Sequence, residues 1–316
     1  MSRVRPSSTP SNRAPSKRMA LSQNFLHSRT LVRGLVAGSG IGPDDLVIEI
    51  GPGKGIVTEA LAGYARHVLT IEKDPAHAEF AQRQMAKTGA TNVTVFAADF
   101  LDFPLPATPY RVFANIPFGI TAAIVGKLTS GIAPPVSAHL VVQQEAADRF
   151  MGAPTVTMQA ATIFPWFTLA IEHRFQRRDF TPIPQVDCVL LRIDLRPEPL
   201  IPPDDRHRHH FEAMVAALFS AWKPSVEAAL TPAVGPEVTK ALRRSLGAQG
   251  ISLANRPSRF PLAGWVALYR DLAKTPNAPW WQALHEAAAR LRSRQETLEK
   301  RTRTPAVTHP ARPPRR

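Results

Sequence analysis

The chain has 316 residues, which is enough for about two domains with a substantial core. Its 39 Lys and Arg exceed its 25 Asp and Glu, for a formal net charge of +14. Such an excess favours a polyanionic partner, nucleic acid or an anionic membrane surface, and the plainer alternative is a basic protein without one. A single cysteine, Cys188, excludes an intrachain disulfide framework and fits a cytoplasmic protein.

Neither a secretion signal nor a membrane span is expected. The basic N-terminus is not followed by an apolar run, and the most apolar window, 158–171, is shorter than the ~20 residues of a spanning helix. Residues 1–18 and 300–316 are rich in Pro and basic residues, so we expect two disordered basic tails. They either attract phosphate regardless of sequence or are simply solvated.

Apolar strands alternate with helical patterns over residues 30–195, which predicts a doubly wound α/β sheet within a domain spanning 19–200. The expected strands are Leu46–Ile50, His67–Glu72, Val93–Ala97, Tyr110–Ala114, Ala138–Gln143, Leu169–Phe175 and Cys188–Leu195. The expected helices between the early strands are Thr58–Tyr64, Pro75–Lys87 and Thr121–Leu128.

Helical patterns alone follow the proline-rich stretch 197–203, which predicts a smaller all-α domain over 201–299. Its helices are expected at Phe211–Trp222, Pro236–Leu246, Leu262–Leu272 and Trp280–Arg301. The histidine-rich run 204–210 is interpreted as a hinge, and no metal site is expected there because Cys and carboxylate ligands at suitable spacing are missing. Arg243, Arg244 and the loop 256–259 are basic enough to contact nucleic acid, although a solvated face explains them equally well.

Polar residues at three successive strand ends predict a pocket for an adenosine-containing cofactor. The turn Gly51-Pro52-Gly53-Lys54-Gly55 lets a ligand lie close to the backbone. Glu72, about twenty residues further on, is placed to accept both ribose hydroxyls, and Asp99 to accept from an adenine amino group. These positions leave NAD and S-adenosylmethionine equally possible.

The end of the fourth strand, Asn115-Ile116-Pro117-Phe118, favours S-adenosylmethionine. It offers hydrogen-bond acceptors and a flat ring but no charged acid or base, and no His or Tyr–Lys pair for hydride chemistry. The Asn115 side-chain oxygen and the Ile116 carbonyl can accept from the two N–H groups of an adenine amine, while Phe118 stacks on the base. We therefore expect methyl transfer to adenine N6 of a nucleic acid, with positioning carrying most of the catalysis.

These residues resemble the rRNA adenine-N6 methyltransferases, the family that contains the erythromycin-resistance (Erm) enzymes and the KsgA-type dimethylases. The resemblance covers residues 21–195 and includes the motifs 22–26, 49–53, 144–149 and 180–187. It implies a Rossmann-like, seven-stranded S-adenosylmethionine-dependent fold with a helical RNA-binding C-terminal domain. It also implies that Phe180 closes over the target base opposite Phe118. The implied cofactor-binding residues are Asn24, Leu26, Gly51, Gly53, Glu72, Asp99 and Asn115.

Departures from the family pattern bear on the substrate. Gln185 stands where members usually have Lys, and Cys188 where they have Ser. KsgA-type enzymes usually read N-L-P-Y-N at the catalytic loop, whereas the Ile116-Pro117-Phe118 version is closer to the Erm side. The resemblance thus points to a monomer that methylates naked or unassembled 23S rRNA in its peptidyl-transferase loop, giving resistance to macrolides, lincosamides and streptogramin B. The alternatives are a KsgA-like enzyme acting on 16S rRNA and a non-catalytic nucleic-acid-binding protein on the same fold.

Overall fold

The computed structural model describes residues 24–130 and 133–302, which form two compact units. The first unit comprises the described residues through Ala147 together with Ala170–Ile193. The second comprises Asp148–Leu169 and the described residues from Asp194 onward. The expected basic arm over 1–18 lies outside the described residues, as does the expected tail apart from its first residues, which continue a helix to Thr302.

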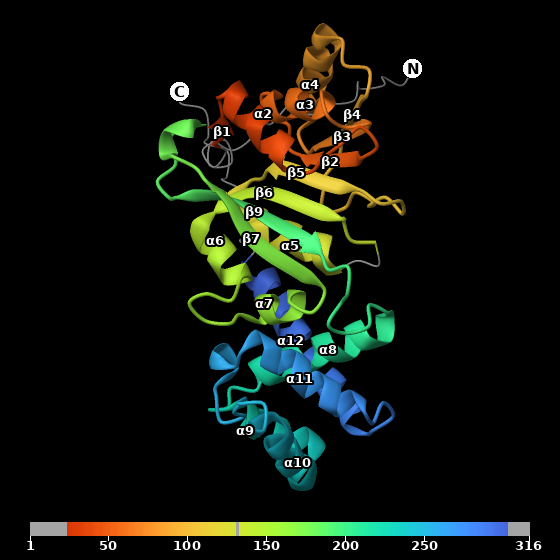
Figure 1. Cartoon of the computed structure of the whole chain (residues 1–316), viewed down its shortest axis with the longest axis vertical. Helices are drawn as coiled ribbons and strands as arrows, with labels where there is room; N and C mark the ends of the chain where they lie inside the picture. Colours follow the sequence, from red (N-terminus) through yellow and green to blue (C-terminus); the bar gives the residue numbers. More distant parts are fainter. Residues whose placement is uncertain (1–23, 131–132, 303–316) are drawn as a thin grey trace, which may run out of the picture. The chain divides into compact units, whose positions relative to one another are not determined.

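A seven-stranded sheet with the order β4-β3-β2-β5-β6-β9-β7 organises the chain (Figure 1). The pairs from β4 through β6 are parallel. The chain moves outward from β2 to β4 and then returns to the other side of β2, so the switch point, where such sheets bind ligands, lies between β2 and β5. The strands are β2 Leu46–Ile50, β3 His67–Glu72, β4 Val93–Ala97, β5 Arg111–Asn115, β6 Ser137–Gln143, β7 Phe167–Arg174 and β9 Cys188–Leu195.

The predicted strands are confirmed to within two residues, and β2, β3, β4 and β9 have the expected bounds. The central strands β2 and β6 are buried on both faces along almost their whole length, as parallel strands covered by helices are. β5 begins and ends one residue later than predicted, so Asn115 is the last residue of the strand and not part of the following loop.

The helices of the first unit are α2 Arg29–Gly38, α3 Ile56–Ala62, α4 Pro75–Thr88 and α5 Thr121–Ser130, followed by α6 Gln144–Phe150 at the boundary with the second unit. α4 has clear termini: the Asp74 side chain accepts from the backbone N–H groups of residues 76 and 77, Pro75 opens the first turn, and Gly89 ends the helix at φ 72°. The structure adds α2, which the sequence patterns did not predict.

A second, two-stranded sheet brings together segments far apart in sequence. β1 Phe25–Leu26 pairs antiparallel with β8 Phe180–Thr181, and Leu26 lies opposite Phe180. The short helix η2 Arg177–Asp179 precedes β8, and the His27 ring hydrogen-bonds to the carbonyl of Arg178 at 2.7 Å. This sheet thus attaches the motif around Asn24 to the motif around Phe180.

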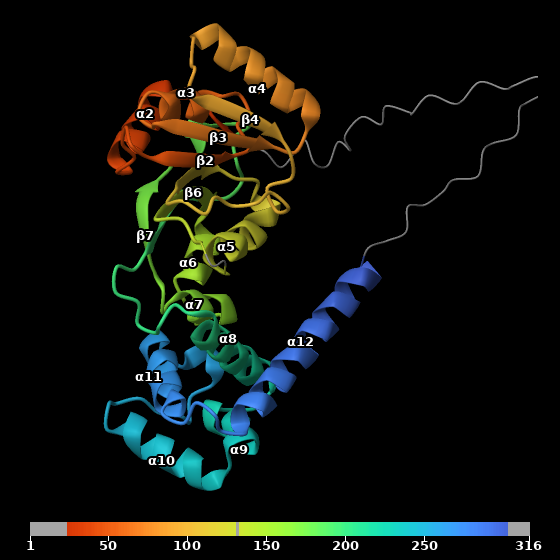
Figure 2. The same ribbon diagram turned by 90° about the vertical axis from the view of Figure 1, so that its right-hand side faces the viewer.

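The second unit is helical in its C-terminal part, and the four expected helices are present as α8 Asp205–Ser220, α10 Pro236–Gly247, α11 Leu262–Ala273 and α12 Trp280–Thr302. The structure adds α9 Val226–Val234 and η3 Pro257–Arg259, which were not predicted, and α7 Met158–Ile163 from earlier in the chain. α8 and α12 pack on each other (Figure 2). Its core contains large aromatic side chains, including Trp166, which meets Phe211 edge-on at 5.4 Å.

The interpretation of 204–210 as a hinge is wrong. Asp204 is the N-cap of α8, where its carboxylate accepts from the backbone N–H of His207 at 3.0 Å, so the run forms the first turns of a helix. Among the described residues, no group of three or more His, Cys, Asp or Glu is placed to hold a metal ion. Nor does that part of the chain contain a helix long and apolar enough to cross a membrane.

Candidate active site

A pocket lies beside the switch point of the sheet, where the ends of β2 and β5 meet the β1 segment. The space inside it, including the part open to solvent, is about 520 Å³. It is lined by Asn24, Phe25, Leu26, Gly51, Pro52, Gly53, Lys54, Ile56, Val57, Asn115, Ile116 and Pro117. Five predicted cofactor residues therefore line one pocket, namely Asn24, Leu26, Gly51, Gly53 and Asn115.

The glycine turn after β2 forms one wall and requires glycine for two reasons. Gly51 and Gly53 have φ angles of 70° and 53°, a left-handed backbone that other residues rarely adopt. A Cβ atom added to Gly53 would also lie 2.6 Å from the Phe25 ring. The turn and the β1 segment therefore pack too closely for any side chain at this position.

Asn115 closes the opposite wall in a fixed orientation. Its side-chain Nδ2 donates a hydrogen bond to the backbone carbonyl of Asn24 at 2.8 Å. Because one side of the amide is used in this way, its oxygen points elsewhere and remains available as an acceptor. The buried Ile116 follows, and Pro117 restricts it to an extended backbone. The ring of Phe118 is half-buried and packs against the apolar core that contains Leu26.

Glu72 ends β3 and Asp99 lies two residues beyond the end of the neighbouring β4, and neither lines this pocket. Glu72 is 7 % exposed, and its Oε1 accepts from the backbone N–H of Asp74 at 2.9 Å. Asp99 pairs with Lys73 at 2.7 Å and accepts from the N–H of Leu101 at 2.9 Å, and these hydrogen bonds lower the pKa of its carboxyl group. Both acids therefore lie along the same edge of the sheet, further from the switch point.

Lys127, on α5, is a residue that the sequence patterns did not single out. Its ammonium donates to the backbone carbonyls of Phe100, Leu101 and Phe103 at 2.6, 2.9 and 2.5 Å. It also lies 5.0 Å from the centre of the Phe100 ring. Lys127 therefore fixes the loop that carries Asp99 and Phe100. The only signal in the sequence is a charged residue within an otherwise apolar helix.

Glu49, inside β2, is the other residue whose role was missed. It is 1 % exposed and accepts hydrogen bonds from the Thr58 and Thr70 hydroxyls at 2.6 and 2.9 Å, both to Oε2. Burial raises the pKa of the Glu49 carboxyl to about 7, against the opposing effect of the two hydroxyls. A buried carboxyl with a raised pKa thus lies two residues before the glycine turn.

Phe180 is brought near the site but is covered. Its ring is 1 % exposed and packs against Phe175 with the ring centres 5.2 Å apart. It belongs to the same apolar core as Leu26, against which Phe118 packs. Stacking of Phe180 on a substrate base therefore remains a prediction, and it requires that the ring first be uncovered.

The sequence matches the model of the ribosomal RNA adenine dimethylase family over residues 14–257. The chain belongs to this family. An rRNA adenine N-6-methyltransferase of Corynebacterium diphtheriae is 37 % identical over 63 % of this chain and 76 % of its own length. A ribosomal RNA small subunit methyltransferase A of Rhodococcus erythropolis is 32 % identical over 78 % of this chain and 85 % of its own. The crystal structure of the 23S rRNA methyltransferase ErmE superposes with a TM-score of 0.69 at 28 % identity, covering 79 % of this chain and 99 % of ErmE.

The fold is therefore the Rossmann-like fold of S-adenosylmethionine-dependent methyltransferases, and this adenine dimethylase family member is an rRNA adenine N6-methyltransferase. The pocket suits the cofactor, since Gly51 and Gly53 line it with a left-handed backbone and no side chains, so a ligand can lie close to the main chain. Asn24, Leu26, Gly51 and Gly53 would hold it. When bound, the cofactor supplies an electrophilic methyl group.

Proposed function

We propose that this enzyme methylates N6 of an adenine in the peptidyl-transferase loop of 23S rRNA and thereby confers resistance to macrolides, lincosamides and streptogramin B. The observation that carries the proposal is the fixed amide of Asn115, whose Nδ2 is bonded to Asn24. Its oxygen is left as an acceptor at the mouth of the cofactor pocket. We further propose that the enzyme acts as a cytoplasmic monomer and that its helical second unit contacts RNA.

In this proposal the protein acts by holding the amine rather than by acid–base chemistry. The nitrogen lone pair of adenine N6 is delocalised into the ring, which makes it a poor nucleophile. The Asn115 oxygen and the Ile116 carbonyl accept from its two N–H groups and favour a pyramidal nitrogen, whose lone pair then points at the methyl group. As the N–C bond forms, the S–C bond breaks and its electron pair stays on sulfur. The methylated amine then loses a proton to solvent, so no strong base is needed.

The choice of 23S over 16S rRNA is supported by the loop Asn115-Ile116-Pro117-Phe118, which is closer to the Erm side of the family. The structural likeness to ErmE, over 99 % of its length, supports the same choice. Methylation of 16S rRNA is the second candidate, because the small subunit methyltransferase A relative matches over 78 % of this chain.

The enzyme and labelled S-adenosylmethionine should be incubated with one RNA substrate at a time. The three substrates are naked 23S rRNA, naked 16S rRNA and small ribosomal subunits. Modified bases are then mapped by primer extension. We expect labelling of one adenine in naked 23S rRNA and a raised inhibitory concentration of erythromycin in sensitive cells that express the enzyme. Labelling of small subunits alone would assign the enzyme to 16S rRNA, and no labelling of any RNA would leave a non-catalytic RNA-binding protein.

The matched variant is Asn115→Ala, which removes the acceptor and keeps the glycine turn. It should abolish transfer while RNA affinity stays close to that of the wild type, and cofactor affinity, measured by calorimetry, should fall far less than the rate, because the only loss there is the bond from Asn115 to Asn24. Wild-type rates for this variant would show that the amine is held by other groups.

A further inference from the structure

Trp222 combines two unfavourable features in the second unit. Its side chain is 92 % exposed, more than any other large apolar side chain of the described residues. Its φ angle is 51°, and within the described chain it is the one non-glycine residue with a positive φ. The predicted helix 211–222 in fact ends at Ser220, so Trp222 follows the C-cap Ala221, at the position where helices often have glycine. A tryptophan here costs stability through its backbone and through the apolar surface that it leaves in water.

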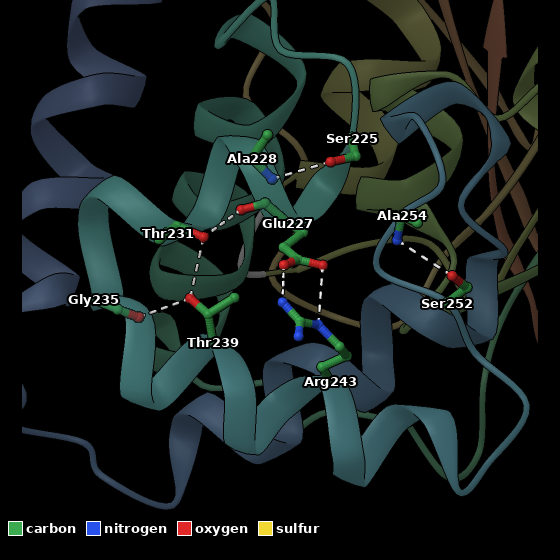
Figure 3. A network of polar contacts seen from close by, with 9 residues as sticks. All are labelled: Ser225, Glu227, Ala228, Thr231, Gly235, Thr239, Arg243, Ser252 and Ala254. Carbon is green, nitrogen blue, oxygen red and sulfur yellow. Dashed lines mark hydrogen bonds and ion pairs between the residues drawn. The ribbon is translucent and has the colours of Figure 1, made fainter.

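The segment after Trp222 is held firmly. The Ser225 hydroxyl accepts from the N–H of Ala228 at 3.1 Å and caps α9. The N–H groups of Val226 and Glu227 donate to the carbonyls of Asn255 and Leu253 at 2.8 and 2.9 Å. Figure 3 shows this part of the unit, with Ser225 and Glu227 on one segment and Ser252 and Ala254 on the loop beside it. The segment that follows Trp222 and Lys223 is therefore bonded to the loop that continues into Arg256.

Both of these bonded segments carry an exposed positive charge. Lys223 and Arg256 are exposed, and neither has a hydrogen bond or ion pair from its side chain in the described part of the chain. The acid that follows Trp222 most closely in sequence is Glu227, and the Arg243 guanidinium bonds to both of its oxygens (Figure 3). Both cations therefore face solvent. For Lys223, no free carboxylate between 221 and 228 offsets the charge.

We infer that Trp222 is a stacking platform for an unpaired nucleobase of the RNA substrate, and that Lys223 and Arg256 bind the flanking phosphates. Every base has a flat apolar face, so a lone exposed indole beside cations suits single-stranded RNA. An apolar protein partner would need a wider patch, and Met151, 37 % exposed, is the only other large apolar side chain exposed in the described part of this unit. The inference rests on the proposed function, which makes RNA the substrate.

The test compares Trp222→Ala and Trp222→Phe in the full-length protein, with a 23S transcript containing the peptidyl-transferase loop. Removing a base-stacking ring should weaken RNA binding about tenfold in a filter assay, and phenylalanine should restore most of it. The KM for RNA should rise similarly, while kcat at saturating RNA and the cofactor affinity should stay unchanged. Phe80→Ala is the control, because Phe80 is an aromatic residue of α4 that is 40 % exposed.

Salt and temperature separate stacking from other roles. Trp222→Ala should leave the slope of log affinity against log salt unchanged, whereas Lys223→Gln should reduce that slope by about one. Trp222→Gly relieves the backbone strain, so its melting temperature should match or exceed that of the wild type while RNA binding is still lost.

Two results would overturn the inference. Unchanged RNA affinity in Trp222→Ala, from a wild type that methylates 23S rRNA, refutes the platform and leaves the proposed function standing. An affinity loss that Trp222→Phe does not restore, together with a lower melting temperature, assigns Trp222 to folding alone. If the wild type neither binds nor labels any RNA, the proposed function fails before these variants are compared.

Discussion

Replacing Glu49 by Gln should change how the stability of this enzyme depends on pH. Burial raises the pKa of the folded-state carboxyl to about 7, from 4.5 in the unfolded chain. Ionisation is thus disfavoured in the folded state. The contribution of the Glu49 carboxyl to the unfolding free energy is fully present below the pKa of the unfolded state. It is lost as the pH rises through the pKa of the folded state. At about 1.4 kcal/mol per pKa unit, the loss between pH 4.5 and 7 is on the order of 3 kcal/mol.

The Glu49→Gln variant has no such loss, and its amide oxygen can still accept from Thr58 and Thr70. The difference in unfolding free energy between this variant and the wild type should therefore move in favour of the variant, by about 3 kcal/mol, between pH 4.5 and 8. Urea titrations at half-unit pH steps measure it. Only this change with pH is diagnostic, since the substitution also adds a constant offset from the new amide N–H groups.

Thr70→Val is the matched control. It removes one of the two hydroxyls that lower the pKa of Glu49, so the loss of stability should still begin near pH 4.5 but extend to a higher pH than in the wild type. A free-energy difference between Glu49→Gln and the wild type that stays constant across this range would refute the reasoning. It would mean that Glu49 ionises at an ordinary pKa despite its burial.

Substitutions at Gly53 and Lys127, each with a control, test cofactor binding. Gly53→Ala places a Cβ 2.6 Å from the Phe25 ring at a left-handed φ, so calorimetry should show cofactor affinity falling more than about tenfold, which corresponds to about 1.4 kcal/mol or more. Gly51→Ala, whose Cβ would meet nothing within 4 Å, should be milder, and equal losses would contradict the steric argument. Lys127→Met removes the donor to the carbonyls of Phe100, Leu101 and Phe103, so the KM for the cofactor should rise about tenfold with kcat retained. Lys127→Arg should recover part of this, and exposed Lys87→Met should be neutral. A change confined to kcat would place Lys127 elsewhere in the mechanism.

The sheet was predictable because its strands are short apolar runs whose burial does not depend on fine detail. β2, β3 and β4 have the expected bounds for this reason. α2 was missed, although Ser28 caps it, because its sequence RTLVRGLVAG carries three glycine or threonine positions that weaken a helical pattern. The two-residue strands β1 and β8 have no local signature, since they exist only through their pairing with each other.

The candidate site could likewise be predicted only in part. Gly51 and Gly53 follow β2 and Asn115 ends β5, and the structure places these three predicted residues in one pocket. The bond from Asn115 to Asn24, across 91 positions, could not be derived from any spacing. The role of Lys127 depends on three carbonyls from another segment, and backbone acceptors carry no sequence signal. The prediction of a hinge at 204–210 was wrong because Asp204 was not recognised as the N-cap of a helix in this charged, histidine-rich run.

The half of the site that would hold the base depends on Phe180, whose ring is 1 % exposed in the core beside Leu26. Either it is a core residue, or β8 shifts when RNA binds and releases the ring toward Phe118. Phe180→Leu separates these roles, because leucine keeps most of the apolar volume and loses the flat ring. If the ring stacks on the base, kcat/KM for RNA should fall more than about tenfold, as base–aromatic stacking implies, with the melting temperature nearly unchanged. If activity and stability instead fall together, or neither falls, Phe180 only fills the core. The base is then held by Phe118 and by the acceptors of Asn115 and Ile116.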